Sequence, residues 1–249
     1  MKRKIAVFYL IGQFREWWKD QFYIPQMEAL ISSGLYDEIE FLDIHISGGR
    51  EPLPFIPNKT RSITYQNNPG HEERELMKSI HRFAIENYEY KILHFHSEGV
   101  TRNEESEIER KMFWRHLMEH CNIHLWKECL ELLNFYDCVG ADYIHQATFN
   151  DPKCIFKAPH FPGMFWWTNA SYFRTLDREF LDQKLPWSRF LAELWIGTKN
   201  PTVYKMHHFP QNYPKLNLDL ELRDIQRNVN SHLDLLKIET REPLSLIPG

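Results

Sequence analysis

The feature that most constrains the fold is a short, unbroken apolar run near the N-terminus, Ile5 to Ile11, which stops at Gly12. An apolar run of this length without polar alternation is typical of a strand that is covered on both faces, as the strands of parallel α/β sheets are. The basic residues before it give the segment a likeness to a signal peptide. However, Gln13 and two charged residues follow where a small-residue cleavage site belongs. We therefore expect a first β-strand here, and a cytoplasmic protein.

Strand and helix patterns alternate after this run, which favours a doubly wound α/β sheet. A helix is expected to begin at Pro25 and to end before Gly34. Apolar residues also recur at helical spacing from Trp114 to Leu133, so a long helix is expected there. The remaining elements of the predicted sheet are strands at 39–46, 63–65, 90–96 and 136–143 and a helix at about 71–87.

The second half of the chain is less regular, and we find no repeat or linker that would divide it. A strand or buried turn is expected at 165–167, and short helices are expected at 170–176 and 187–195. A charged helical pattern follows near Leu216 to Leu236. We therefore predict one domain, residues 1–210, and a C-terminal extension, residues 211–249, that packs on it.

Composition excludes several classes of function. The chain has 249 residues and carries 30 Lys and Arg against 34 Asp and Glu, a net charge of −4, so nucleic acid is not an expected partner. Its four cysteines have no CxxC spacing, which argues against a zinc ribbon or a redox pair. No run approaches the roughly 18 apolar residues of a membrane span. The aromatic fraction of 14% and the 13 histidines exceed what a core requires, so stacking and imidazole chemistry are plausible.

Candidate binding residues follow the predicted strands, because ligands of open α/β sheets bind beyond the carboxyl ends of the strands. Neither GxGxxG nor a P-loop is present, which argues against the usual NAD enzymes and P-loop NTPases. Among the residues that this rule selects as candidates for binding a ligand are Tyr9, Gln13, Asn67, His94, His96, Ser97 and Glu98.

Two histidines two residues apart, His94 and His96, lie on the same face of a predicted strand. This spacing could hold a divalent metal, and Asp43 and His45 repeat the alternation, as an acid and an imidazole, in the predicted strand at 39–46. The same imidazoles could instead donate hydrogen bonds to a phosphate, or be hydrogen-bonded residues of the core. A metal-dependent hydrolase built on these four side chains is therefore one hypothesis.

The segment from His160 to Trp167 and the glutamate at 193 suggest a second kind of chemistry. Trp166 and Trp167 point to opposite sides of a strand, so one can belong to the core while the other faces a cleft that suits a sugar. Arg189 and Glu193 share one helical face and can form a simple ion pair. In a cleft, Glu193 could instead act as a general base toward an attacking hydroxyl.

Taken in order, these segments resemble a family of sugar-transferase domains from bacterial-type and viral polysaccharide assembly, a group similar to GT-A glycosyltransferases. The resemblance spans about residues 90 to 200, and three positions depart from the usual pattern: His94, Glu98 and Met164. The segments that carry it are YKILHFHSEGV at 90–100, Trp114-Arg115, YDCVG at 136–140, HFPGMFWWTNASYFRTL at 160–176, and Arg189 with AELWI at 192–196.

The resemblance implies a GT-A-like, Rossmann-like mixed sheet flanked by helices, and an enzyme of the hexosyltransferase type. It places His96 and the loop through Gly99 at the donor diphosphate, and His160, Trp166 and Trp167 at the carbohydrate acceptor. Glu193 is then the candidate base of an inverting transfer. A divalent cofactor, Mn²⁺ or Mg²⁺, would be held by His94 and His96, or the transfer would proceed without metal. A metal-dependent hydrolase and a catalytically silent sugar-binding protein are the alternatives.

Overall fold

A computed structural model describes residues 4–66, 72–97, 105–144, 159–182, 191–207 and 217–239. Within these residues, seven strands form one sheet in the order β3-β2-β1-β4-β6-β5-β7. The predicted α/β mixed sheet flanked by helices is therefore confirmed. The strands are β1 (Ile5–Gly12), β2 (Phe41–Ser47), β3 (Thr60–Tyr65), β4 (Lys91–His96), β5 (Cys138–Gly140), β6 (Trp166–Asn169) and β7 (Val203–Lys205).

Four parallel strands make up one half of the sheet, with β1 at its centre. Strand β1 is completely buried because β2 and β4 flank it in parallel and helices cover both of its faces. The other half is mixed, because β6 runs antiparallel to both β4 and β5, and β5 pairs in parallel with β7. The antiparallel β6 brings the segment before Trp166 to the carboxyl ends of β1 and β4.

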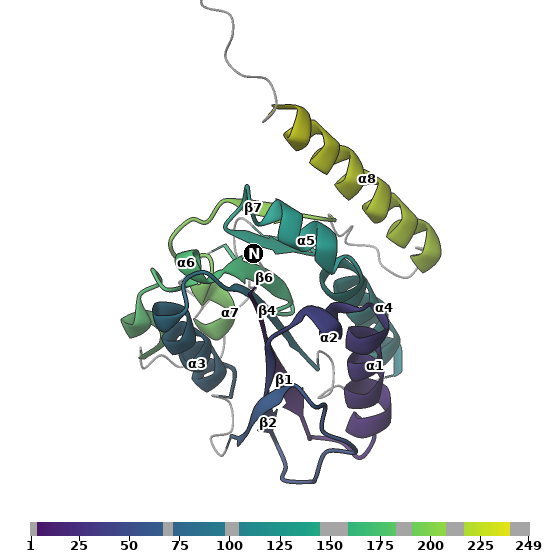
Figure 1. Cartoon of the computed structure of the whole chain (residues 1–249). Helices are drawn as coiled ribbons and strands as arrows, with labels where there is room; N and C mark the ends of the chain where they lie inside the picture. The colour runs from purple at the N-terminus through teal and green to yellow at the C-terminus, as the bar shows by residue number, and fades with distance from the viewer. Residues whose placement is uncertain are drawn as a thin grey trace, which may run out of the picture.

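Helices cover the sheet in two layers, which lie on opposite sides of the strands in Figure 1. The side chains on one face of β1, which include Val7 and Tyr9, pack with α1, α4 and α5. Those on the other face, which include Phe8, pack with α3, α6 and α7. The helices are α1 (Ile24–Ser32), α2 (Leu35–Glu38), α3 (Glu72–Glu86), α4 (Glu105–Glu119), α5 (Trp126–Leu132), α6 (Ala170–Phe173), α7 (Leu191–Trp195) and α8 (Leu218–Glu239), with a 3₁₀ turn at Arg178–Asp182.

The observed helices differ from the predicted ones at two π-helical turns. The segment expected to begin at Pro25 is already helical from Lys19, because the π-helical turn η1 (Lys19–Tyr23) runs directly into α1. The long helix expected from Trp114 to Leu133 is divided by a second π-helical turn, η2 (His120–His124). Both turns lie on the α1 and α4 side of the sheet.

Helix α8, in the predicted C-terminal extension, packs against α4 and α5. Ile225, Val229 and Leu233 are buried in the core of that side. Its polar anchors include His232, whose Nε2 lies 2.8 Å from the Tyr136 hydroxyl, and Lys237, whose Nζ lies 3.0 Å from Glu131. Among the described residues, no helix has both the length and the apolarity needed to cross a membrane.

Candidate functional site

Hydrogen bonds join the carboxyl ends of the three central parallel strands to one another. The Gly12 N–H at the end of β1 donates to the Ser97 hydroxyl just after β4, at 2.8 Å. The next N–H, of Gln13, donates to the Ser47 carbonyl at the end of β2, at 2.7 Å. Predicted residues Gln13 and Ser97 therefore lie at one edge of the sheet, and both help to hold that edge together.

The side chain of Gln13 fixes the loop after β2. Its amide donates to the Glu51 carbonyl at 2.8 Å, and its amide oxygen accepts the Glu51 N–H at 2.9 Å. Gly49 lies so close that a Cβ there would be 2.8 Å from the Gln13 amide oxygen. Gln13 therefore holds the backbone of this loop, beside the place where a ligand of the strand ends would lie.

A tight turn between Phe161 and Phe165 reaches the same edge. Trp166 pairs with His94 in the sheet, so the residues immediately before it lie at the end of β4. The Phe165 ring is 5.8 Å from the His96 ring. Gly163 and Met164 have positive φ values of 78° and 52°, and a left-handed conformation is uncommon for a residue such as methionine. Backbone strain of this kind gathers at functional sites.

Glu193 on α7 meets this turn. Its Oε1 accepts the Gly163 N–H at 3.2 Å and lies 4.0 Å from His160 Nε2. The Glu193 side chain is 19% exposed, whereas the His160 side chain is nearly buried. The turn thus brings together three predicted site residues: Glu193 and His160 at one end, and His96 beside Phe165 at the other.

The backbone around His160 is fixed by an unusually close contact. His160 forms an antiparallel bridge with Ile144, with N···O distances of 2.9 and 3.0 Å. A Cβ at Gly197, just after α7, would lie 1.5 Å from the Pro159 carbonyl oxygen. Only a glycine lets the chain after α7 approach this closely, so the position of His160 relative to Glu193 depends on Gly197.

Both predicted acceptor tryptophans belong to the core. Trp166 and Trp167 are 1% and 0% exposed. Trp166 stacks on Phe173, with ring centroids 5.4 Å apart, and the Trp167 indole N–H donates to the Asn122 carbonyl at 2.8 Å. The expectation that one indole faces a cleft is wrong, because β6 is an interior strand and α4 to α6 cover both of its faces.

Tyr9 and His94 are also buried within the sheet layer. The Tyr9 hydroxyl donates to Gln26 Oε1 at 2.8 Å, and burial holds the pKa of the phenol well above its ordinary value. His94 Nδ1 lies 3.0 Å from the Phe8 carbonyl, which can only accept, so the proton is on Nδ1. Burial lowers the pKa of His94 to about 3, and the ring is neutral at physiological pH. Its Nε2 is buried and makes no hydrogen bond within the described residues.

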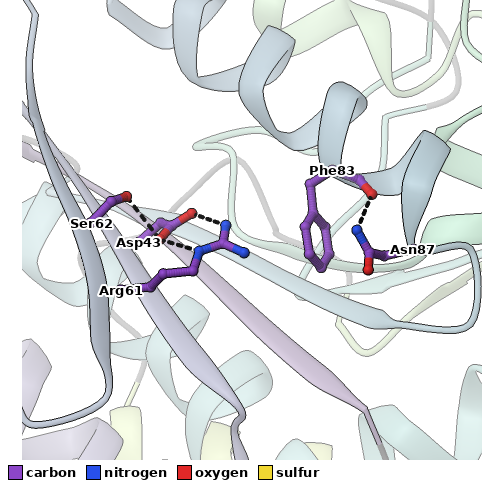
Figure 2. Close-up of polar contacts among 5 residues, drawn as sticks. All are labelled: Asp43, Arg61, Ser62, Phe83 and Asn87. Carbon is purple, nitrogen blue, oxygen red and sulfur yellow. Dashed lines mark hydrogen bonds and ion pairs between the residues drawn. The ribbon is translucent and has the colours of Figure 1, made fainter.

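The four side chains of the hydrolase hypothesis are engaged in other interactions. Figure 2 shows the Asp43 carboxylate bound by the Arg61 guanidinium and by the Ser62 hydroxyl, whose Oγ is 2.9 Å from Oδ1. His45 Nδ1 lies 2.9 Å from the Gln66 amide nitrogen. This arrangement leaves Asp43 neutralised by a cation that it would have to exchange for a metal, so the geometry does not favour a metal-dependent hydrolase.

The described residues do not fit a divalent-metal site. Across the described ranges, no group of three or more His, Cys, Asp or Glu side chains is arranged to hold a metal ion. Mn²⁺ and Mg²⁺ prefer oxygen ligands, whereas His94 and His96 offer nitrogen. Their ring centroids lie 6.3 Å apart. Three residues with predicted roles, Asn67, Glu98 and Arg189, lie outside the described residues.

Sequence reasoning missed a buried polar group beneath this edge. Gln26, Arg115 and Glu119 are at most 6% exposed, although each lies on an otherwise apolar helix face. Arg115 and Glu119 are four residues apart, a spacing that predicts an ion pair on one helical face. The available signal was the presence of these two charges within the apolar stripe from Trp114 to Leu133.

Comparisons with known proteins do not assign the chain to a family: no known protein family matches its sequence, and no curated protein matches it. Solved structures that resemble it include the crystal structure of 4-diphosphocytidyl-2C-methyl-D-erythritol synthase from Anaerococcus prevotii. That chain is 12% identical, the match covers 94% of this chain and 97% of that one, and the TM-score is 0.42. A likeness at this level carries no argument about activity, so the functional case rests on the residues themselves.

Proposed function

We propose that this protein is a GT-A-like glycosyltransferase that transfers a sugar from a nucleotide-sugar donor to a hydroxyl of a carbohydrate acceptor, in glycan or polysaccharide synthesis. Glu193 is the general base in this proposal. It removes the proton of the acceptor hydroxyl as that oxygen attacks the anomeric carbon in line with the leaving diphosphate. Attack from the opposite side inverts the anomeric configuration.

The observation that carries the proposal is the setting of Glu193. Its carboxylate is partly exposed, is oriented by the Gly163 N–H at 3.2 Å, and stands 4.0 Å from His160 Nε2. A base must be held in position and must still reach the proton that it removes. The Gly163 N–H supplies the orientation, and the partial exposure supplies the access.

The donor is proposed to lie along the carboxyl ends of β1, β2 and β4, with Gln13, His96 and Ser97 closest to it. Ligands of open α/β sheets bind at this edge, where loops from several strands converge. The Tyr9 and His94 side chains lie below this surface, so in this proposal they shape the floor of the donor site. Asn67 and Glu98 keep their proposed donor-binding roles from the sequence.

The acceptor is proposed to lie over Glu193 and His160. Trp166 and Trp167 are in the core and support the Phe161–Phe165 turn from within. Of the three residues predicted to bind the acceptor, His160 is therefore the one that we propose contacts it. Because the described residues do not fit a divalent metal, no step of the proposed transfer passes through Mn²⁺ or Mg²⁺. The binding screen below is nevertheless run both with and without Mn²⁺.

A thermal-shift screen tests the proposal. The protein is heated with UDP-, GDP-, dTDP- and CMP-sugars, each with and without Mn²⁺, and with the free sugars as controls. A donor at 100 times its dissociation constant stabilises the folded state by about 2.7 kcal/mol, a clear rise in melting temperature. Stabilisation by one nucleotide-sugar and by the nucleotide that it releases is the expected result; that nucleotide is a nucleoside diphosphate for the UDP-, GDP- and dTDP-sugars and CMP for the CMP-sugars. Stabilisation by free sugars alone would instead indicate a sugar-binding protein, and no response to any nucleotide would contradict a transferase.

A further inference from the structure

A buried polar cluster, made of Tyr9, Gln26, Arg115 and Glu119, lies between β1, α1 and α4. The Tyr9 hydroxyl donates to the Gln26 amide oxygen at 2.8 Å, and the Gln26 amide nitrogen donates to Glu119 Oε1 at 2.9 Å. Arg115 Nε is 3.2 Å from the same carboxylate oxygen. The cluster is therefore a chain of contacts that ends in a cation.

Arg115 is held in place but incompletely paired. Its residue is 2% exposed, and its guanidinium carbon lies 4.5 Å from the centre of the Phe22 ring. In the described part of the chain, Nε and Nη1 form no hydrogen bond, although Nε lies near Glu119. A guanidinium has five N–H donors, and leaving buried donors without an acceptor destabilises a fold. Among the described residues, Nη1 of Arg115 therefore has no oxygen acceptor.

The carboxylate of Glu119 is shared between Arg115 and other groups. Glu119 Oε1 also accepts the Gln26 amide, and Oε2 lies 3.4 Å from His116 Nδ1. Burial lowers the pKa of Arg115 from its ordinary value, but an arginine stays protonated near neutral pH. Buried ion pairs add little to stability compared with well-packed apolar residues, so this pair is better explained by a role in binding.

The cluster lies at the same edge of the sheet as Glu193. The Gln26 amide nitrogen also donates to the carbonyl of His96, the last residue of β4, at 3.2 Å. Helix α4 connects the two places, because a Cβ at Gly163 would lie 2.7 Å from Met118 Sδ and 2.9 Å from the Trp114 indole nitrogen. Trp114 thus lies beside the Gly163 turn, and the next residue of α4, Arg115, belongs to the cluster.

We propose that Arg115 binds the diphosphate of the donor, with its guanidinium donating to phosphate oxygens beside the end of β4. A planar guanidinium matches the spacing of phosphate oxygens and donates to two of them at once. The Phe22 ring keeps the guanidinium plane fixed, and Glu119 and Gln26 keep it at this edge. This inference rests on the proposed function, because it names the group that receives the leaving diphosphate.

The test is calorimetric titration of the full chain with inorganic pyrophosphate, UDP and GDP. Three proteins are compared: the unaltered protein, Arg115→Lys, and Arg61→Lys as the matched control. Arg61 is also paired with a carboxylate and stacked on an aromatic ring, that of Phe41 at 3.5 Å, but it lies on the α3 side of the sheet. Lysine keeps the charge and loses the two-pronged geometry.

We expect Arg115→Lys to weaken the binding of every diphosphate that the unaltered protein binds by at least tenfold, while Arg61→Lys stays within twofold. If Arg115→Lys does not fold, Phe22→Leu replaces it. That variant keeps Arg115 but removes its stacking partner, and it should weaken diphosphate binding at least threefold.

The outcomes separate this inference from the proposed function. Diphosphate binding that is unchanged in the variants overturns the role of Arg115 and leaves the transferase proposal standing. Arg115-dependent binding of pyrophosphate without binding of any nucleotide supports the anion site and contradicts the nucleotide donor. If the unaltered protein binds none of the three ligands, the role of Arg115 is overturned, and the transferase proposal then depends on the dTDP- and CMP-sugars of the thermal-shift screen.

Discussion

At the scale of single residues, Gly163 and Gly34 have nearly the same positive φ angle in different surroundings. Their φ values are 78° and 77°, but a Cβ at Gly34 would meet nothing within 4 Å, whereas one at Gly163 would lie 2.7 Å from Met118 Sδ. The comparison therefore separates the cost of the left-handed backbone from the cost of steric overlap.

We predict that Gly163→Ala destabilises the protein by about 2–5 kcal/mol, the sum of a left-handed backbone cost and an overpacking cost. Gly34→Ala should cost only the backbone part, about 1 kcal/mol. Urea unfolding of both variants measures the difference. Equal losses would mean that Met118 moves aside freely and that the Gly163 turn is not tightly held against α4.

Two buried histidines make stability depend on pH. Burial lowers the pKa of His45 to about 4 despite nearby Asp43, and lowers that of His94 to about 3. The folded protein keeps both rings neutral, whereas the unfolded chain takes up their protons below a pKa of about 6.5. Stability is therefore fully present above pH 6.5 and is lost as the pH falls toward 4.

The prediction is that the free energy of unfolding falls between pH 6.5 and pH 4 by up to about 1.4 kcal/mol per pH unit for each of these histidines. His45→Gln removes the contribution of His45 and should give a shallower pH dependence. Chemical denaturation at a series of pH values measures the slope. An unchanged slope in His45→Gln would show that His45 is already protonated or exposed in the folded protein.

The placement of a site residue could be predicted from the sequence only where neighbouring residues in the chain determine it. The approach of His96 to the strand edge follows from its place at the end of an apolar run, so the sequence was sufficient. The burial of Trp166 and Trp167 was not predictable, because it depends on an interior strand whose neighbours are distant in the sequence. The buried pair of Arg115 and Glu119 includes a hydrogen bond from Gln26 to Glu119, and Gln26 lies 89 positions before Arg115, so the cluster was missed for the same reason.

At the scale of elements, α8 offers a direct test of packing. Leu233 is buried in the core on the α4 and α5 side of the sheet, and Leu235, two residues further on, is 59% exposed. We predict that Leu233→Ala costs about 2–5 kcal/mol and that Leu235→Ala changes stability by no more than about 0.5 kcal/mol. Chemical denaturation of both variants measures this. A small loss for Leu233→Ala would mean that α8 contributes little to the fold.

The elements that sequence patterns predicted well are those with one clear apolar period. Strands β1, β2 and β4 and helix α3 lie within a few residues of their predicted bounds, because each has a simple burial pattern. The π-helical turns η1 and η2 were not predicted, because one inserted residue shifts the apolar stripe without ending it. Strand β7 was also missed, because three half-buried residues give no period.

At the scale of the whole molecule, the antiparallel strand β6 explains where the candidate site lies. It returns the chain to the carboxyl ends of β1 and β4, so the Phe161–Phe165 turn, Glu193 and His96 meet at that edge of the sheet. Alternation predicted an α/β sheet, but no local pattern specifies strand order. The meeting of residues 96, 163 and 193 could therefore be seen only in the folded chain.

The role of Glu193 as the general base is tested by the release of nucleoside diphosphate from the stabilising donor, measured for the unaltered protein and for Glu193→Gln. Glutamine keeps the shape of the side chain and its contact with the Gly163 N–H but cannot act as a base. The matched control is Glu131→Gln, which removes a carboxylate paired with Lys237 on the opposite side of the sheet.

We predict that Glu193→Gln lowers turnover by at least about 100-fold, the range of a lost general base, while donor affinity and the unfolding midpoint stay near those of the unaltered protein. Glu131→Gln should leave turnover unchanged. Turnover of Glu193→Gln within threefold of the unaltered protein would contradict the account, because the carboxylate that defines the site would then have no part in the chemistry.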